Sequence, residues 1–258
     1  MYTVKDIYNF LDEFCPFENC LDFDNVGVLL GSAEDKVTKV LLVLDIVDEV
    51  YEEAQRLNAN LIITHHPIIF NGLKKISSDS LICKLLKENI NVISAHTNLD
   101  VAKNGVNFCL AKALNLNNLQ VLSFAENNKN LPLGYIGDLS EPLNCTDFAR
   151  FTKEQLNCKG LRYVDIRQKN IQRVAVGSGA CGDLIYDAVN QQVDAFITGE
   201  IKYHEILYAK QNKVCVVDVG HYKSEDVVLE PLRKKLSDNF ENIEFLKSQV
   251  DIDSINYV

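Results

Sequence analysis

Two adjacent histidines directly follow a short apolar segment of the chain. Leu61 to Thr64 is rich in strand-forming residues and leads into His65, His66 and Pro67. Because consecutive residues of a regular strand point to opposite faces, the two rings can converge only where the strand has ended. Two adjacent imidazoles do not easily coordinate a single metal ion, whereas two ions about 3.5 to 4 Å apart could bind one imidazole each. The alternative is that both are ordinary core or surface histidines.

Two further histidines each stand four residues before a carboxylate. His96 precedes Asp100 in a predicted loop after a strand, and His221 precedes Glu225 where a loop meets a predicted helix. If the second pair is helical, a spacing of four places both side chains on one face. For His221 and Glu225 taken alone, a hydrogen-bonded surface pair is the simpler interpretation. Together with the adjacent histidines, the two pairs favour a shared metal site.

Ligands of these types restrict the metal and its chemistry. Imidazole and carboxylate groups suit zinc, iron, manganese or cobalt better than calcium. None of the eight cysteines forms a CxxC motif, so we expect no structural zinc site and predict buried, reduced thiols. A metal held by such ligands generates hydroxide near neutral pH and polarises a carbonyl, phosphoryl or imine-like carbon. The residues therefore predict metal-assisted hydrolysis.

An alternation of strands and helices would bring these residues to one edge of a sheet. Helical connections imply parallel strands, and ligands of an open parallel sheet usually bind at the carboxyl ends of its strands. His65, His96 and His221 each follow a predicted buried strand closely. The predicted strands cover residues 40–44, 61–64, 91–95, 174–176, 195–198 and 213–217, with helices at 47–57, 80–88 and 183–191.

Further elements are predicted on either side of these strands. Thr3 is a suitable N-cap for a first helix, and Asp24, Asn25 and Gly27 favour a tight turn before a short strand. An alternative role for Asp24 or Asn25 is to orient a ligand or substrate. The remaining predictions are helices at 105–114, 146–156 and 224–235, and strands at 133–139, 161–166 and 243–246.

Two segments of the chain share one pattern. Residues 40–64 and 174–198 have the same length and the same succession of strand, loop, helix and strand. This alignment places Thr64-His65-His66 opposite Thr198-Gly199-Glu200. We therefore predict an α/β fold with two similar halves and mainly parallel sheets, with a dinuclear metal site in the cleft and an internal duplication as a hypothesis.

The asparagine-rich segment 115–130 is the best candidate for a domain boundary. We predict a metal-binding α/β domain at residues 1–125 plus 205–258. A second α/β domain is predicted at residues 126–204, each boundary holding to within about 15 residues.

The charge of the chain limits its partners. The formal net charge of the 258 residues is −10 at pH 7, and no run of lysine or arginine occurs. A nucleic-acid-binding surface needs clustered positive charge, so nucleic acid is not an expected partner. A nucleotide or phosphorylated small molecule is compatible with the charge, because a bound divalent metal can supply the positive charge. The start lacks a signal-peptide pattern and no apolar run reaches the ~20 residues that span a membrane, so we expect a cytoplasmic protein without a membrane partner.

Five motifs, taken in order, resemble those of one known family. The chain is similar to the GTP cyclohydrolase 1 type 2 homologues, also called the Ngg-interacting-factor-three-like proteins, over essentially its whole length. The motifs are Asp24-Asn25-Val26-Gly27, Thr64-His65-His66-Pro67, His96-Thr97-Asn98-Leu99-Asp100, Thr198-Gly199-Glu200 and Gly220-His221-Tyr222-Lys223-Ser224-Glu225. Some longer members carry an inserted domain, for which this chain is too short.

The resemblance implies a particular set of metal ligands. Two divalent metal ions per subunit, which are zinc, iron or manganese, would be bound by five side chains, with Glu225 as the bridge. These side chains belong to His65, His66, Asp100, His221 and Glu225. The resemblance also implies a ring-shaped homohexamer whose sites face an inner cavity.

The family name implies a reaction on a nucleotide. The expected activity is a metal-dependent hydrolysis that converts GTP to dihydroneopterin triphosphate plus formate. His96, Glu200 and His204 are candidate catalytic residues, because each lies near a predicted strand end and could carry protons. Four lysines are positional candidates for contacting the triphosphate: Lys74, Lys103, Lys202 and Lys223. Two alternatives stay open, namely a metal-dependent phosphoesterase and a non-enzymatic metal-binding or interaction protein with a ring-shaped scaffold.

Overall fold

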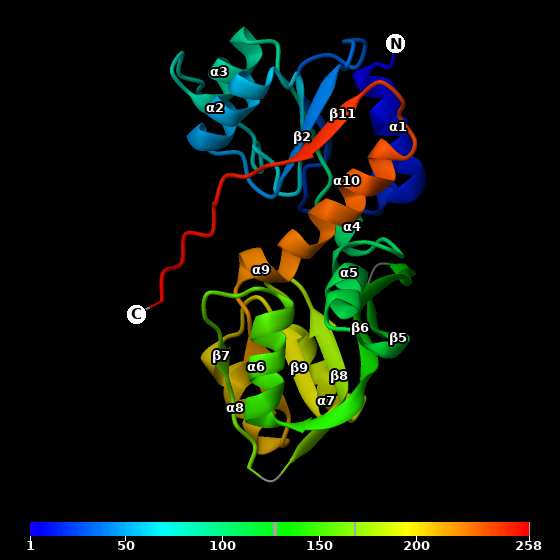
Figure 1. Ribbon diagram of the computed structural model, residues 1–258, viewed down its shortest axis with the longest axis vertical. Helices are drawn as coiled ribbons and strands as arrows, with labels where there is room; N and C mark the ends of the chain where they lie inside the picture. Colours follow the sequence, from blue (N-terminus) through cyan, green and yellow to red (C-terminus); the bar gives the residue numbers. More distant parts are fainter. Residues whose placement is uncertain (126–127, 168, 258) are drawn as a thin grey trace. The chain divides into compact units, whose positions relative to one another are not determined.

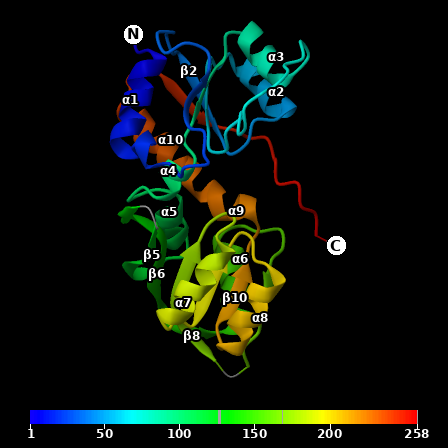
Figure 2. The same cartoon turned by 180° about the vertical axis from the view of Figure 1, so that it is seen from behind.

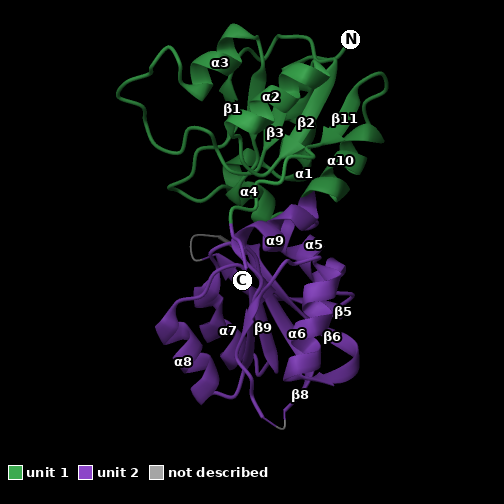
Figure 3. Cartoon of the chain, turned by 60° about the vertical axis from the view of Figure 1, so that its left-hand side comes forward, with its two compact units in different colours: residues 1–102, 229–254 green, residues 103–228, 255–258 purple. Residues whose placement is uncertain are grey.

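The computed structural model describes residues 1–125, 128–167 and 169–257, which form two compact units (Figure 3). Unit 1 comprises Met1–Ala102 and Leu229–Ser254, and unit 2 comprises Lys103–Val228 and Ile255–Val258. The sequence predicts domain boundaries after residues 125 and 204, and that division into domains stays a prediction. Among the described residues, no helix combines the length and the apolar character needed to cross a bilayer.

The sheet of unit 1 brings the ends of three strands into register. Its strands, in order across the sheet, are β1 (Gly27–Leu30), β4 (Asn91–Ser94), β3 (Leu61–Thr64), β2 (Lys39–Val43) and β11 (Glu244–Lys247). β1 runs antiparallel to β4, and the other neighbours are parallel. Val43 pairs with Thr64 and Thr64 pairs with Ser94, so β2, β3 and β4 end at one edge. The residues that follow these strands therefore leave the sheet side by side.

The central strands β2, β3 and β4 are buried on both faces of the sheet, which explains why apolar residues predominate in them. α2 (Asp48–Leu57) and α3 (Leu81–Lys87) lie side by side in Figure 1. They share a core with the alternate strand residues Leu41, Val43, Ile62 and Val92. The intervening residues are also buried, namely Val40, Leu42, Leu61 and Ile63. α10 (Leu229–Ser237) packs on β2 and β11.

Short helices complete unit 1. α1 (Val4–Phe14) begins at the predicted N-cap, where Thr3 Oγ1 accepts a hydrogen bond from the Asp6 backbone N–H and the Asp6 carboxylate accepts one from the Thr3 N–H. This reciprocal pair is a capping box, so the prediction for the start of the first helix is confirmed. η1 (Phe17–Asn19) follows, and α4 (Thr97–Asp100) adds one turn after β4.

The sheet of unit 2 combines parallel and antiparallel strands. Its strands, in order, are β5 (Asn117–Ala125), β6 (Asn128–Asn144), β8 (Asn170–Gly177), β9 (Ala195–Thr198), β10 (Cys215–Asp218) and β7 (Arg162–Tyr163). Only β8, β9 and β10 are parallel to one another. The other three strands pair antiparallel, so the prediction of mainly parallel sheets is wrong for this unit.

The asparagine-rich segment shows why one of the antiparallel strands is not predicted. It forms β5, an edge strand that pairs with β6 alone. Asn117 and Asn118 are exposed there, because an antiparallel edge strand can face water. The polar composition of this segment therefore resembles that of a linker, although most of the segment forms a strand.

Alternate residues of the parallel strands in unit 2 build two separate cores. On one face, α5 (Val106–Ala113) and α6 (Cys145–Gln155) pack with Val174, Val176, Ala195, Ile197, Cys215 and Val217. On the other face, α7 (Ile185–Asn190) and α8 (Tyr203–Gln211) pack with Ala175, Phe196 and Val216. Figures 1 and 2 show α6 on one side of the sheet and α7 with α8 on the opposite side.

Several predicted elements differ in extent from those of the structure. The sequence predicts a strand at 133–139, whereas β6 covers 17 residues and pairs with both β5 and β8. The strand predicted at 161–166 shortens to β7, an edge strand in which Arg162 and Tyr163 pair with β10. The helix predicted at 224–235 is divided into α9 (His221–Glu225), η3 (Asp226–Val228) and α10. A short turn, η2 (Gly182–Leu184), precedes α7.

The two units share a succession of elements. Unit 1 runs β2-α2-β3-α3-β4 and unit 2 runs β8-α7-β9-α8-β10, each with three adjacent parallel strands. Val43 pairs with Thr64 in the first, and Gly177 pairs with Thr198 in the second. This matches the predicted alignment of residues 40–64 with 174–198, while descent from one duplicated segment stays a hypothesis.

Candidate metal centre

Three histidines of unit 1 gather where β3 and β4 end. One ring nitrogen from each of His65, His66 and His96 lies within 4.8 Å of those of the other two. The ring centroids are 5.0 to 5.4 Å apart. His65 is only 2% exposed, and the other two are half-buried. The parallel register of β3 and β4 therefore brings the ring of His96 to those of His65 and His66, which lie 31 and 30 residues earlier in the chain.

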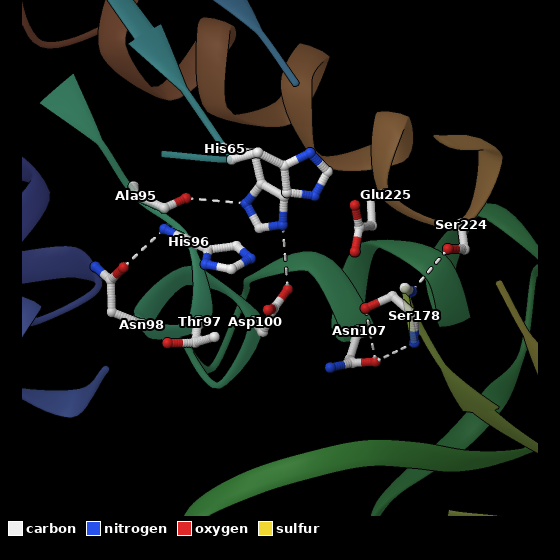
Figure 4. Close-up of polar contacts among 12 residues, drawn as sticks. His65, Ala95, His96, Thr97, Asn98, Asp100, Asn107, Ser178, Ser224 and Glu225 are labelled. Carbon is white, nitrogen blue, oxygen red and sulfur yellow. Dashed lines mark hydrogen bonds and ion pairs between the residues drawn. The ribbon is translucent and has the colours of Figure 1, made fainter. Parts of the chain in front are cut away.

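The hydrogen bond of His65 determines which nitrogen can bind a metal. Its Nδ1 lies 2.9 Å from the carbonyl oxygen of Ala95, a contact that Figure 4 marks with a dashed line. A carbonyl oxygen can only accept, so Nδ1 carries the proton and donates. In neutral imidazole this leaves the lone pair on Nε2, the atom available for coordination.

The same arrangement recurs at the other two rings. His66 Nδ1 lies 2.7 Å from Asp45 Oδ1, and His96 Nδ1 lies 2.8 Å from Asp24 Oδ1. Ionised carboxylates accept hydrogen bonds only, so both rings also carry the Nδ1 proton. A carboxylate or carbonyl behind a histidine ring is the usual arrangement at metal sites, because it fixes the ring and raises its basicity. The donor set therefore fits a divalent transition metal.

Asp24 is held in place by the residues after β4. Thr97 donates to its Oδ2 from the backbone N–H at 3.0 Å and from Oγ1 at 2.5 Å. Burial pushes the pKa of Asp24 upward, but the hydrogen bonds from His96 and Thr97 outweigh burial and lower the pKa to about 2. Asp24 thus remains a carboxylate that orients His96. The alternative role of this segment, to orient a ligand or substrate, stays a prediction.

Asp100 adds a carboxylate to the cluster in unit 1. The sequence predicts a loop after His96, but residues 97–100 form the helical turn α4, whose Asp100 N–H donates to the His96 carbonyl at 3.1 Å. The turn directs the Asp100 side chain toward His65, where Oδ1 lies 3.6 Å from Nε2 (Figure 4). Unit 1 therefore brings together four of the predicted residues: His65, His66, His96 and Asp100.

The remaining predicted ligands lie together in unit 2. His221 and Glu225 are on one face of α9, with His221 Nε2 3.1 Å from Glu225 Oε2. His221 Nδ1 lies 2.7 Å from Glu200 Oε1, so this ring follows the pattern of the three in unit 1. Glu225 is only 3% exposed, which argues against the interpretation as a surface pair. Glu200 contacts His221 directly and thereby fixes its ring.

Two glycines shape the surroundings of α9, and the first, Gly179, belongs to none of the five motifs. Gly179 donates its N–H to Ser224 Oγ at 2.8 Å, and Ser224 donates to the His221 carbonyl at 2.7 Å. A Cβ on Gly179 would lie 2.2 Å from Glu225 Oε1, and one on Gly199 would lie 2.5 Å from Ser224 Oγ. Only the small-residue run after β8 signals this role in the sequence.

Asp45 is a second residue at the site that lies outside the five motifs. It lies two residues after β2 and contacts His66 although it carries no motif. Its signal is its position at the same sheet edge as His65 and His66. His204, by contrast, has a mostly exposed side chain on α8, and its Nε2 lies 3.9 Å from Glu205 Oε1. Its role in proton transfer stays a prediction.

Comparison with known proteins identifies the family. The model of the family described as Duf34/NIF3 (NGG1p interacting factor 3) matches residues 2–254. The chain belongs to the DUF34/NIF3 family. The resemblance drawn from the five motifs is thereby confirmed.

Relatives within the DUF34/NIF3 family match along nearly their whole length. A protein of Clostridium acetobutylicum is 34% identical over 265 residues, covering 98% of each chain, and one of Clostridium perfringens is 32% identical over 260 residues, covering 99% of each. Both are named GTP cyclohydrolase 1 type 2 homolog.

Solved structures of the family share the fold. A hypothetical protein of Staphylococcus aureus has a TM-score of 0.93 at 31% identity, covering 99% of each chain. A Bacillus cereus protein related to NIF3 has a TM-score of 0.91 at 25% identity, covering 100% of this chain and 99% of its own.

Proposed function

We propose that this DUF34/NIF3 protein is a metal-dependent hydrolase with two divalent ions per subunit. The proposed ligands are His65, His66, Asp100, His221 and Glu225, with Glu225 as the bridge. The observation that carries the proposal is the common hydrogen bonding of the histidines, each of which has an acceptor behind Nδ1. This arrangement keeps the lone pair on Nε2, as a metal ligand requires. Zinc, iron and manganese are the candidate ions.

The surrounding residues have defined tasks in this proposal. Asp45, Asp24 and Glu200 hold the rings of His66, His96 and His221. When bound, the ions lower the pKa of water and polarise an electrophilic carbon or phosphorus atom. His96, Glu200 and His204 are the proposed proton carriers, since imidazole and carboxylate side chains are the usual general acids and bases of enzymes.

The proposed substrate is a nucleotide, and the specific proposal is GTP. The printed name of the clostridial relatives supports this choice. The reaction would open the five-membered ring of guanine, release formate and reclose the product to dihydroneopterin triphosphate. A ring-shaped homohexamer is the proposed assembly, as the family resemblance implies.

Metal analysis combined with an activity assay tests the proposal. Purified protein is stripped with a chelator, reloaded separately with Zn²⁺, Fe²⁺ or Mn²⁺, and analysed for metal per subunit. We expect two ions per subunit and, on incubation with GTP, release of formate together with pterin fluorescence. Metal binding without formate from GTP would overturn the specific reaction, and turnover of phosphoesters in parallel assays would identify a phosphoesterase. Failure to retain any of the three ions would overturn the hydrolase proposal itself.

A further inference from the structure

Two phenylalanines of unit 1 present their rings to solvent. Phe23 is 63% exposed and Phe70 is 44% exposed. Their ring centroids are 6.2 Å apart and the rings are tilted by 49°. Neither ring is needed to fill the core, and exposing two adjacent aromatic rings is unfavourable in water. Two adjacent exposed rings are a candidate binding surface. We call Phe23 and Phe70 the aromatic pair.

Hydrogen bonds hold the loops of the aromatic pair together. Asn25 Nδ2 donates to the Ile69 carbonyl at 2.6 Å, which links the loop of Phe23 to the residue just before Phe70. On the other side of Phe23, the Leu21 N–H donates to Thr97 Oγ1 at 2.9 Å. The backbone is thus anchored close to both phenylalanines. Rings carried on an anchored backbone bind a flat partner at lower entropic cost than rings carried on mobile loops.

The aromatic pair adjoins the histidine cluster of unit 1. The Phe70 ring centroid lies 6.3 Å from that of His96, in an edge-to-face arrangement at 74°. His96 in turn lies 5.1 Å from His65 and 5.4 Å from His66, centroid to centroid. A molecule resting on Phe70 would therefore have one edge beside the imidazoles. This position favours a small ligand of the metal site as the occupant.

Positive charge follows the aromatic pair along the chain. Residues 71–79 are all exposed, and they include Lys74 and Lys75. Because a chain extends at most about 3.6 Å per residue, the Cα atom of Lys74 lies within about 14 Å of the Cα atom of Phe70. A nucleotide combines a flat ring with phosphates over such a span.

We propose that the aromatic pair binds the planar heterocycle of a nucleotide-like substrate beside His96, with its phosphates toward Lys74 and Lys75. The tilt of the rings lets a flat heterocycle stack on one phenyl group and meet the other edge to face. Stacking recognises any planar heterocycle, so affinity depends on the ring more than on its substituents. The inference rests on the proposed function for the choice of a nucleotide, and it adds the residues that bind the base.

A fluorescent variant tests this directly. The chain contains no tryptophan, so Phe70→Trp introduces a single indole into the aromatic pair. We expect guanosine and GTP to quench its emission, and ribose 5-phosphate, which has no heterocycle, to leave the emission unchanged. The titration is done on metal-free and on metal-loaded protein. Unchanged emission with guanosine in both forms would overturn the proposal.

Calorimetric titration of unlabelled variants gives an independent readout. Phe23→Leu and Phe70→Leu keep an apolar side chain but remove the aromatic face, and we expect each to weaken guanosine binding by about 5- to 150-fold. Metal content should stay at the wild-type level, so a failure of the aromatic pair is distinguishable from a failure of the metal site. Phe124→Leu changes a similarly exposed phenylalanine in unit 2 and should leave guanosine affinity unchanged.

Two results of this titration would overturn the inference. The first is guanosine binding by Phe23→Leu and Phe70→Leu that equals that of the wild type. The second is the same unchanged guanosine affinity accompanied by a change of oligomeric state, measured by light scattering. That outcome would show that the aromatic pair contacts a second copy of the chain.

Discussion

His66 Nδ1 lies 2.7 Å from Oδ1 of Asp45, and the two residues come from neighbouring parallel strands of unit 1. Asp45 follows β2 and His66 follows β3, so the register of the sheet sets their distance. The carboxylate can only accept, and it therefore keeps the proton of His66 on Nδ1. A residue with no motif of its own thus determines which nitrogen of a predicted ligand can bind metal.

Asp45→Ala should weaken metal binding without unfolding the protein. Loss of a carboxylate behind a metal-binding histidine typically costs 10- to 100-fold in affinity, and we expect about that loss for zinc in a competition titration with a chromogenic chelator. Asp48→Ala removes another exposed carboxylate of unit 1, which pairs with Lys84, and should leave zinc affinity unchanged. Equal affinities of the two variants would contradict the role assigned to Asp45.

Gly179→Ala should disturb Glu225. Gly179 has a φ of +58°, where an added Cβ costs about 1 to 2 kcal/mol, and that Cβ would lie 2.2 Å from Glu225 Oε1. We expect a lower melting temperature and less bound metal per subunit, measured by differential scanning calorimetry and elemental analysis. Gly72→Ala is the matched control, because a Cβ at Gly72 meets no atom of the described residues within 4 Å. Full metal content in Gly179→Ala would show that Glu225 tolerates the displacement.

Several candidate metal ligands can be predicted from the sequence because the patterns that indicate them are local. His65 and His66 directly follow an apolar strand, and a run of apolar residues bounded by polar ones is a strong strand signal. The spacing of four between His221 and Glu225 predicts one helical face, and α9 confirms it. In both cases the deciding information lies within a few residues of the site.

The remaining features depend on contacts between distant segments. Asp24 contacts His96 across 72 positions of the chain, and no local pattern distinguishes it from an ordinary turn residue. The Glu225 side chain packs so close to the Gly179 backbone that a Cβ would not fit between them. This contact is visible only in the folded structure. The antiparallel strand β5 is equally hidden, since its exposed asparagines match a linker as well as an edge strand. Pairing partners, and not residue types, decide these cases.

His65→Ala and Asp100→Ala should remove bound metal while the fold remains. Both residues are proposed ligands, so their loss should cost more than the 10- to 100-fold expected for a residue behind a ligand. Elemental analysis after dialysis against metal-free buffer measures the bound metal per subunit, and far-ultraviolet circular dichroism checks the fold. His204→Ala removes a histidine whose side chain is 67% exposed and should retain wild-type metal content. Undiminished metal in His65→Ala would mean that the ligand assignment is wrong.

Ionised Asp24 should stabilise unit 1 in a pH-dependent way. Burial raises its pKa, but hydrogen bonds from His96 and Thr97 lower it from 3.8 to about 2. The folded state therefore holds the carboxylate in its charged form more strongly than the unfolded chain does. The resulting stability is fully present above about pH 4 and is lost as the pH falls through about 2. The shift corresponds to about 2 kcal/mol at neutral pH.

Asp24→Asn tests this linkage, because asparagine has no proton to release. In urea unfolding of chelator-treated protein, the wild type should lose free energy of unfolding between pH 4 and pH 2 more steeply than Asp24→Asn, which should already be about 2 kcal/mol less stable at pH 7. Asp22→Asn changes an exposed acid two residues earlier and should follow the wild-type curve. Parallel curves for wild type and Asp24→Asn would show that the hydrogen bonds to His96 and Thr97 do not favour the charged form.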